Sequence, residues 1–151
     1  MAAPAPPGKL TGKACVITGA TSGIGLATAR LFSTHGARLA IMARDTRVVQ
    51  STAAELAPDT VTVTGDVARV DDLAALMHAP NDAYGGIDVV AANAGIGRFA
   101  PLDAVTEEDF NALCAIHLRG AFFTVQTALP TCAPAARSCW LAPRTRNGAS
   151  Q

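Results

Sequence analysis

The stretch that decides the fold reads Thr18-Gly19-Ala20-Thr21-Ser22-Gly23-Ile24-Gly25. It follows the apolar run of residues 14–17, which is typical of a strand covered on both faces, and it leads into apolar positions at helical spacing. A glycine-rich turn between a buried strand and a helix lets the backbone come close to a pyrophosphate, whose charge the helix's unpaired amides favour. The stretch therefore predicts a nucleotide-binding turn. A tight turn without a ligand is the alternative interpretation.

Three further buried or half-buried strands are predicted, over residues 39–43, 61–64 and 87–92. The second of these, residues 61–64, alternates in polarity, which suits an edge strand. Helices are predicted after the glycine turn as far as Gly36, over residues 48–56, and from Asp71 to a stop at Pro80. Strands that alternate with helices through short connections indicate a parallel sheet, whose ligand crevice lies at the carboxyl ends of the strands.

A long helix is predicted from Thr106, its candidate N-cap, to a stop at Pro130. Its first turn is acidic, which suits the positive end of the helix dipole. Apolar and neutral residues then hold one face for more than five turns: Phe110, Leu113, Cys114, His117, Leu118, Ala121, Phe122, Val125 and Leu129. Beyond Pro130 no periodicity and no fifth strand are predicted.

Three motifs together resemble the classical short-chain dehydrogenase/reductase family: the glycine turn, Asp66-Val67 after the third strand, and Asn93-Ala94-Gly95 after the fourth. The resemblance covers about residues 10–130. It implies a Rossmann-like three-layer α/β fold with a parallel, incomplete sheet of about four strands in the order 3-2-1-4, and a nicotinamide dinucleotide as cofactor. It also implies roles for individual residues. Gly19, Ser22, Gly23, Ile24 and Gly25 would surround the phosphates, Asp66 and Val67 would meet the adenine, and Asn93, Ala94 and Gly95 would lie on the adenosine side.

Two of these assignments have structural alternatives, because Asp66 also suits an ordinary turn at a strand end and Asn93 also suits a brace for the backbone. The choice of cofactor depends on Met42-Ala43-Arg44-Asp45, at the end of the second strand. An acid about 20 residues beyond the glycines bonds the ribose 2′-hydroxyl and repels a 2′-phosphate. Ala43 stands at that place by resemblance, and Arg44 offers a phosphate a charge-assisted contact of about 1.5 to 3 kcal/mol. The sequence thus favours NADP(H). Asp45 keeps NAD(H) as the alternative, and a merely solvated Arg44 is another.

The family resemblance implies hydride transfer between the nicotinamide and a carbonyl or alcohol carbon, with a proton passed by a tyrosine whose partner lysine lies four residues later. The one tyrosine of these 151 residues is Tyr84, and its residue four on is Asp88. No catalytic residue is therefore assigned, and Tyr84 is interpreted as a packing residue. His117 stands where the family usually has a catalytic-site asparagine. It is interpreted as a packed helix residue, and the alternative is that it replaces the asparagine as a hydrogen-bonding group in a water relay.

Composition and charge exclude several function classes. The formal net charge is zero and half of the residues are hydrophobic, so nothing indicates a nucleic acid, a membrane or an acidic substrate as partner. The three histidines and four cysteines lack metal-ligand spacing, so no metal site is expected and the thiols are expected to be reduced. No secretory signal and no unbroken apolar span of about 18 residues is present, which favours the cytoplasm.

The expected organisation is a flexible proline-rich leader (residues 1–10), a partial dinucleotide-binding domain (11–130) and an irregular or disordered tail (131–151). All twelve acidic residues lie at or before Asp109, so the chain changes character late. The tail resembles the product of an altered reading frame or a truncated copy, and a tail adapted to a partner is the alternative. Without further strands the fourth strand would be an open edge, which favours self-association or association with an intact relative.

Overall fold

The computed structural model describes residues 8–140, with side chains as far as Cys132. Five strands form one parallel sheet in the order β3-β2-β1-β4-β5. Their bounds are β1 Ala14–Thr18, β2 Arg38–Ala43, β3 Val61–Thr64, β4 Ile87–Ala92 and β5 Cys132–Trp140. The helices are α1 Gly23–Thr34, α2 Thr46–Ala54, α3 Val70–Tyr84, η1 Leu102–Ala104, α4 Glu107–Leu113, η2 Cys114–Gly120, α5 Ala121–Ala128 and η3 Leu129–Thr131. The predicted α/β class and the strand order 3-2-1-4 are confirmed.

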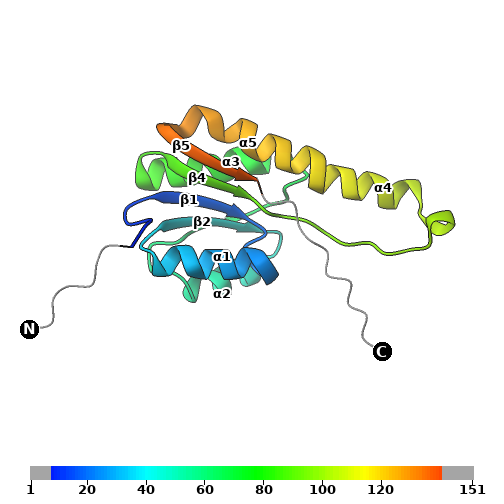
Figure 1. Ribbon diagram of the computed structural model, residues 1–151, viewed down its shortest axis with the longest axis horizontal. Coiled ribbons are helices and arrows are strands. Elements are labelled where there is room, and N and C mark those ends of the chain that lie inside the picture. Colours follow the sequence, from blue (N-terminus) through cyan, green and yellow to red (C-terminus); the bar gives the residue numbers. More distant parts are fainter. Residues whose placement is uncertain (1–7, 141–151) are drawn as a thin grey trace, which may run out of the picture.

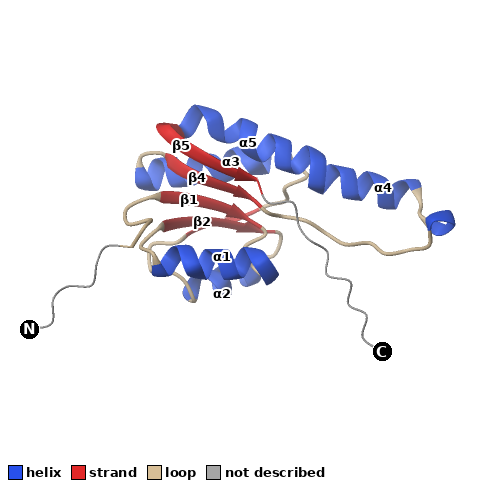
Figure 2. Ribbon diagram, viewed as in Figure 1, coloured by secondary structure: helices blue, strands red, loops and turns tan. Residues whose placement is uncertain are grey.

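β1 is the central strand, and all five of its residues are buried. Its side chains alternate between the two faces of the sheet, as the pleat requires. Cys15 and Ile17 pack with residues of β2, α1 and α2, whereas Val16 packs with residues of α3, β4 and α5. A continuous apolar run is what such a doubly covered strand needs. Figure 1 shows α1 and α2 on one face and α3 and α5 on the other, and Figure 2 shows the same three layers by element type.

The prediction that no strand follows Pro130 is wrong, because β5 pairs in parallel with β4. Strand pairing depends on main-chain groups, so a segment without side-chain periodicity can still supply it. The register between β4 and β5 shifts, since Ile87 pairs with Cys132 but Val89 pairs with Arg137. Pro134 falls in that irregular stretch, where the missing N–H of a proline is tolerated. β4 is thus an inner strand rather than an open edge, and residues 141–151 of the predicted tail lie outside the described residues.

The predicted helix stop at Pro80 is also wrong. α3 continues through Pro80 and ends at Gly85, whose φ of +81° is the left-handed conformation of a helix C-cap. A proline inside a helix costs about 3 kcal/mol, because it removes one hydrogen bond and crowds the preceding turn. Leu73, Leu76, Met77 and Pro80 itself are buried, and this packing offsets the cost.

The predicted long helix is present as α4, η2 and α5 in succession, and it ends in η3. Thr106 is its N-cap as predicted, since Thr106 Oγ1 accepts from the Asp109 amide at 3.1 Å within a capping box. The middle segment, η2, is π-helical, a form often found at functional sites. Figure 1 shows α4 and the loop leading to it extending beyond the carboxyl end of the sheet.

The long helix exposes several large apolar side chains. Phe110, Leu118, Phe122 and Leu129 are each more than half exposed, whereas Thr124 and Ala128 of α5 are buried toward α3 and β4 and Gly120 is buried beside Val67. By length and composition, the helical run Glu107–Thr131 is the one described segment that meets the requirements for crossing a membrane, with a mean hydropathy of 1.2. Its buried side packs against the sheet, as the core helix of a globular domain does.

The described part of the predicted leader is a turn that packs on the domain. The Leu10 amide donates to the His35 carbonyl at 3.1 Å, and the Leu10 side chain packs against the core on the α1 side. Residues 1–7 of the leader lie outside the described residues.

Candidate cofactor site

The glycine turn joins β1 to α1 by two backbone conformations that favour glycine. Gly19 has a φ of +67° and Gly23 a φ of +52°. Gly25 is needed for a different reason: a Cβ there would lie 2.0 Å from the Gly19 carbonyl oxygen. The turn therefore folds back tightly onto the start of α1, and the unpaired amides of the first helical turn lie beside it. Such a cradle suits a phosphate group.

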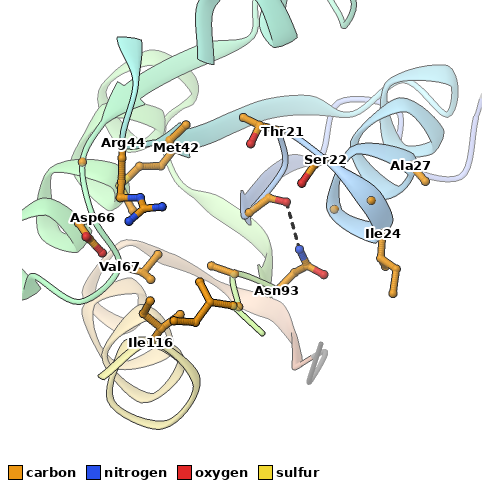
Figure 3. Close-up of a pocket in the computed structure, with 18 residues that line it drawn as sticks. Thr21, Ser22, Ile24, Ala27, Met42, Arg44, Asp66, Val67, Asn93 and Ile116 are labelled. Carbon is orange, nitrogen blue, oxygen red and sulfur yellow. Dashed lines mark hydrogen bonds between the residues drawn. The ribbon is translucent and has the colours of Figure 1, made fainter. Parts of the chain in front are cut away.

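Asn93 ties the end of β4 to this turn. Its side-chain amide donates to the carbonyls of Thr18 and Gly19, each at 3.2 Å, and its backbone amide donates to Thr18 Oγ1 at 3.1 Å. Asn93 is buried, with 9% of its surface exposed. Figure 3 shows the bond from Asn93 to the glycine turn. Asn93 thus braces the backbone, as the structural alternative predicted, and it also lines the adjoining pocket.

All eleven predicted site residues line one pocket of about 930 Å³ at the carboxyl ends of the strands: Gly19, Ser22, Gly23, Ile24, Gly25, Arg44, Asp66, Val67, Asn93, Ala94 and Gly95. A volume of this size suits a large ligand or cofactor. In Figure 3, Arg44 lies on the same side of the pocket as Asp66 and Val67, and Ser22 and Ile24 lie on the opposite side. Three motifs that are far apart in sequence therefore form one site.

Seven lining residues were not predicted: Thr21, Ala27, Met42, Ala43, Gly65, Ile96 and Ile116. Thr21, Met42 and Ala43 stand inside the quoted motifs but were not assigned to the site, and Ala27, Gly65 and Ile96 are within two residues of assigned positions. Ile116 comes from η2, more than 20 residues away from the other motifs. No local pattern signals its place, because only the packing of the long helix brings it to the pocket.

The two charged residues after β2 have different roles. Asp45 is the N-cap of α2, since its Oδ1 accepts from the Arg47 amide at 2.7 Å and from the Val48 amide at 3.2 Å. Arg44 is exposed and lines the pocket. The carboxylate is thus engaged by the helix, while the guanidinium is placed to meet a ligand in the pocket.

The loop after β3 forms an Asx turn, in which Asp66 Oδ1 accepts from the Ala68 amide at 2.9 Å. The Asp66 amide in turn donates to Asp72 Oδ2 at 2.9 Å. The contacts of the Asp66 carboxylate are therefore those of an ordinary turn at a strand end, which was the alternative interpretation of this residue. Asp66 and Val67 nevertheless lie on the pocket wall.

The side chain of His117 contacts the main chain of the loop after β4, and a role for it in a water relay stays a prediction. Its Nε2 lies 2.7 Å from the Ile96 carbonyl oxygen and 3.2 Å from the Ile96 amide nitrogen. One ring nitrogen either donates or accepts, so each tautomer serves one of these two groups. His117 thus joins the helix to the loop after β4. Arg98 and Asp109 form an ion pair between the same loop and α4, which lowers the pKa of Asp109 through hydrogen bonds from Arg98 and Thr106.

Tyr84 lies near the start of β2, away from the pocket. Its hydroxyl contacts the Leu39 carbonyl at 3.0 Å and the Asp59 carbonyl, and the Arg38 guanidinium lies 4.8 Å from its ring centre. Burial is the main cause of a raised pKa for Tyr84, the opposite of what a proton donor at neutral pH needs. Burial likewise raises the pKa of Cys15 to about 12. Over residues 8–132, no group of three or more His, Cys, Asp or Glu side chains is placed to hold a metal ion.

Comparison with known proteins gives the family. The model of the short chain dehydrogenase family matches residues 13–138, and the chain belongs to this family. It is 39% identical over 127 residues to "Oxidoreductase asL5" of Sarocladium schorii, a match that covers 84% of this chain and 51% of the relative. The chain spans about half the length of the curated relatives it matches.

Two similar solved structures hold dinucleotides. A 3-ketoacyl-(acyl-carrier-protein) reductase from Brucella melitensis, complexed with NADH, has a TM-score of 0.78 and 30% identity, covering 82% of this chain and 51% of that one. A short chain dehydrogenase from Burkholderia cenocepacia J2315, in complex with NADP, has a TM-score of 0.78 and 27% identity, covering 87% of this chain and 56% of that one. These two similar structures thus hold nicotinamide dinucleotides of both kinds.

Proposed function

We propose that this chain is the dinucleotide-binding part of a short-chain dehydrogenase and that it prefers NADP(H) to NAD(H). The observation that carries the proposal is one pocket that joins the glycine turn to Arg44 while Asp45 is engaged as a helix cap. The cradle fits the cofactor's phosphates, since a Cβ at Gly25 would collide with the turn. When bound, the nicotinamide supplies hydride chemistry. The residues named here would bind and orient the dinucleotide.

The preference follows from charge at the edge of the pocket. A carboxylate there would bond a ribose 2′-hydroxyl and repel a 2′-phosphate. One carboxylate oxygen of Asp45 accepts hydrogen bonds from two amides of α2. Turning this side chain toward a ribose would break the helix cap. Arg44 carries the opposite charge, is exposed, and makes no hydrogen bond over residues 8–132 that would compete with a phosphate. We therefore assign the 2′-phosphate to Arg44.

Replacing Arg44 by alanine is expected to weaken NADPH binding about tenfold and to leave NADH binding nearly unchanged, because the charge-assisted contact of an exposed side chain contributes about 1.5 kcal/mol, the lower end of its range. Calorimetric titration of the purified chain with each cofactor measures both affinities. Arg47→Ala is the matched control and should change neither affinity, because Arg47 is an exposed arginine in the first turn of α2 that does not line the pocket. Equal losses for NADPH and NADH would contradict the assignment of Arg44.

For the 151-residue chain itself we propose binding without the family's usual catalysis. The family reaction needs a tyrosine with a lysine four residues later, and Tyr84 has neither that lysine nor a place at the pocket. Loss of a general acid alone costs about 10² to 10⁴ in rate.

We also propose that the chain is cytoplasmic. Free thiols at Cys15, Cys114 and Cys132 agree with this location, because the cytoplasm keeps thiols reduced.

The exposed apolar residues of the long helix favour a second candidate function, a non-enzymatic module that associates with itself or with an intact relative. Leu118 and Phe122 lie one turn apart and are 67% and 59% exposed. Side chains of this size rarely line an exposed helix face without a partner. The outer side of β5 would extend the same surface through main-chain pairing.

Replacing Leu118 by aspartate is expected to abolish this association, because a charge would be buried at the centre of the contact. Sedimentation velocity of the chain alone, and co-purification with a full-length family member, measure it. Leu31→Asp changes another leucine that is more than half exposed, on α1 at the other face of the sheet, and should leave association intact. A chain that is monomeric and captures no relative before mutation would reject this second function.

A further inference from the structure

We propose that Asp72 and Arg119 are positioning residues that hold the loop between β3 and α3, residues 65–69, in the shape that receives the adenosine part of the cofactor. The inference rests on the proposed function, because it concerns the wall of the same pocket. Neither Asp72 nor Arg119 lines the pocket, whereas Asp66 and Val67 of the loop do. Both positioning residues therefore act through the loop backbone.

Asp72 holds the first half of the loop from the first turn of α3. Its Oδ2 accepts from the Asp66 amide at 2.9 Å and lies 3.4 Å from Arg69 Nε. The side chain is about three-quarters covered, with 27% of its surface exposed. Gly65 permits this approach, since a Cβ at Gly65 would lie 2.8 Å from the Asp72 Cβ. The amide of a pocket residue is thus fixed by a carboxylate outside the pocket.

Arg119 holds the second half of the loop from the π-helical segment η2. Its Nη1 donates to the Ala68 carbonyl at 2.9 Å, and its guanidinium lies 5.9 Å from the ring centre of Phe123. The next residue, Gly120, lets the helix come close, because a Cβ there would lie 3.0 Å from the Val67 carbonyl oxygen. The loop therefore receives one acceptor from α3 and one donor from η2, at the two residues that flank Val67 in the sequence.

Such a two-sided arrangement sets the loop before the ligand arrives. A loop that becomes ordered only when the ligand binds loses conformational entropy at that step, which weakens binding. A loop that is already ordered avoids this loss. The adenosine end of the ligand should therefore lose affinity when either side chain is removed. The affinity for the nicotinamide end should not change, because Asp72 and Arg119 hold only the loop at residues 65–69.

The experiment compares three probes by calorimetric titration: NADPH, adenosine 2′,5′-bisphosphate and nicotinamide mononucleotide. For Asp72→Ala and for Arg119→Met, the first two probes are expected to bind about three- to tenfold more weakly, the range that one hydrogen bond allows. The mononucleotide should bind as to the wild type. Asp72→Asn keeps an oxygen acceptor for the Asp66 amide and should restore most of the affinity. Arg119→Lys keeps one donor and should restore part of it.

Glu55→Ala and Arg30→Met are the matched controls, since these exposed side chains form an ion pair between α1 and α2, outside the pocket. Neither control substitution should change the affinity of the chain for any of the three probes. Circular dichroism checks that each variant is folded, and Arg119→Met carries the test if Asp72→Ala does not fold. Unchanged binding of the bisphosphate to folded variants, or an equal loss for all three probes, overturns the inference. A wild-type chain that binds no probe rejects the proposed function itself.

Discussion

Alanine at Gly25 is expected to abolish dinucleotide binding and to lower the free energy of unfolding by about 2 to 3 kcal/mol. The added Cβ would lie 2.0 Å from the Gly19 carbonyl oxygen and 2.5 Å from Asn93 Nδ2. Both atoms belong to the connection between β1, the glycine turn and β4, and neither is the free end of a flexible side chain. The turn must therefore open, and opening it disperses the amides that suit a phosphate. Urea unfolding and calorimetric titration with NADPH measure the two effects.

The control is Gly12→Ala, which introduces backbone strain without a collision and so distinguishes the effect of strain from the effect of the collision at Gly25. Gly12 has a φ of +74°, and a Cβ there meets nothing within 4 Å. Alanine at Gly12 should cost about 1 to 2 kcal/mol for the left-handed conformation and leave the affinity for NADPH unchanged. If Gly25→Ala bound NADPH as tightly as Gly12→Ala, the tight turn would not be the phosphate site.

Replacing Asn93 by leucine is expected to cost about 2 to 3 kcal/mol of stability and at least tenfold in NADPH affinity. The carbonyls of Thr18 and Gly19 would both lose the donor they share, in a place with little access to water. Leucine has a similar volume, so the loss reports hydrogen bonding rather than a cavity. The turn and the end of β4 would also lose their link, and both lie on the pocket.

The control for this second experiment is Thr52→Val. Thr52 is buried to a similar degree, but its hydroxyl donates within α2 to the Val48 carbonyl, away from the pocket. It should lower stability slightly and leave binding intact. An Asn93→Leu variant that kept both its stability and its affinity would show that the brace is dispensable.

The sequence alone was sufficient to predict the strands whose side chains show a pattern of apolar and polar residues. β1, β2 and β4 are apolar runs because both faces of the sheet are covered, and β3 alternates because it lies at the edge. β5 was missed because its place depends on main-chain pairing with β4, which leaves no periodicity in the side chains. The helix stop at Pro80 was wrong because the local rule against proline was overridden by burial of the surrounding face.

The site divides in the same way. All eleven predicted residues gather at one pocket because they follow the carboxyl ends of parallel strands, where topology brings them together. Whether they bind NADP(H) stays a prediction. The sequence did not predict that Ile116 lines the pocket, nor the positioning roles proposed for Asp72 and Arg119. These depend on how the helices pack, and no short-range pattern in the sequence encodes that packing.

The order of strands in the sheet has a consequence for how the chain acquires its structure. β1 lies between β2 and β4, and Val16 pairs on one side with Ala40 and on the other with Val90. The second partner is far along the chain, so a large loop must close before the centre of the sheet is complete, which makes folding slow. During synthesis, the most apolar strand emerges long before its second neighbour does. Until β4 arrives, its unpaired edge would be a site for chaperone capture or aggregation.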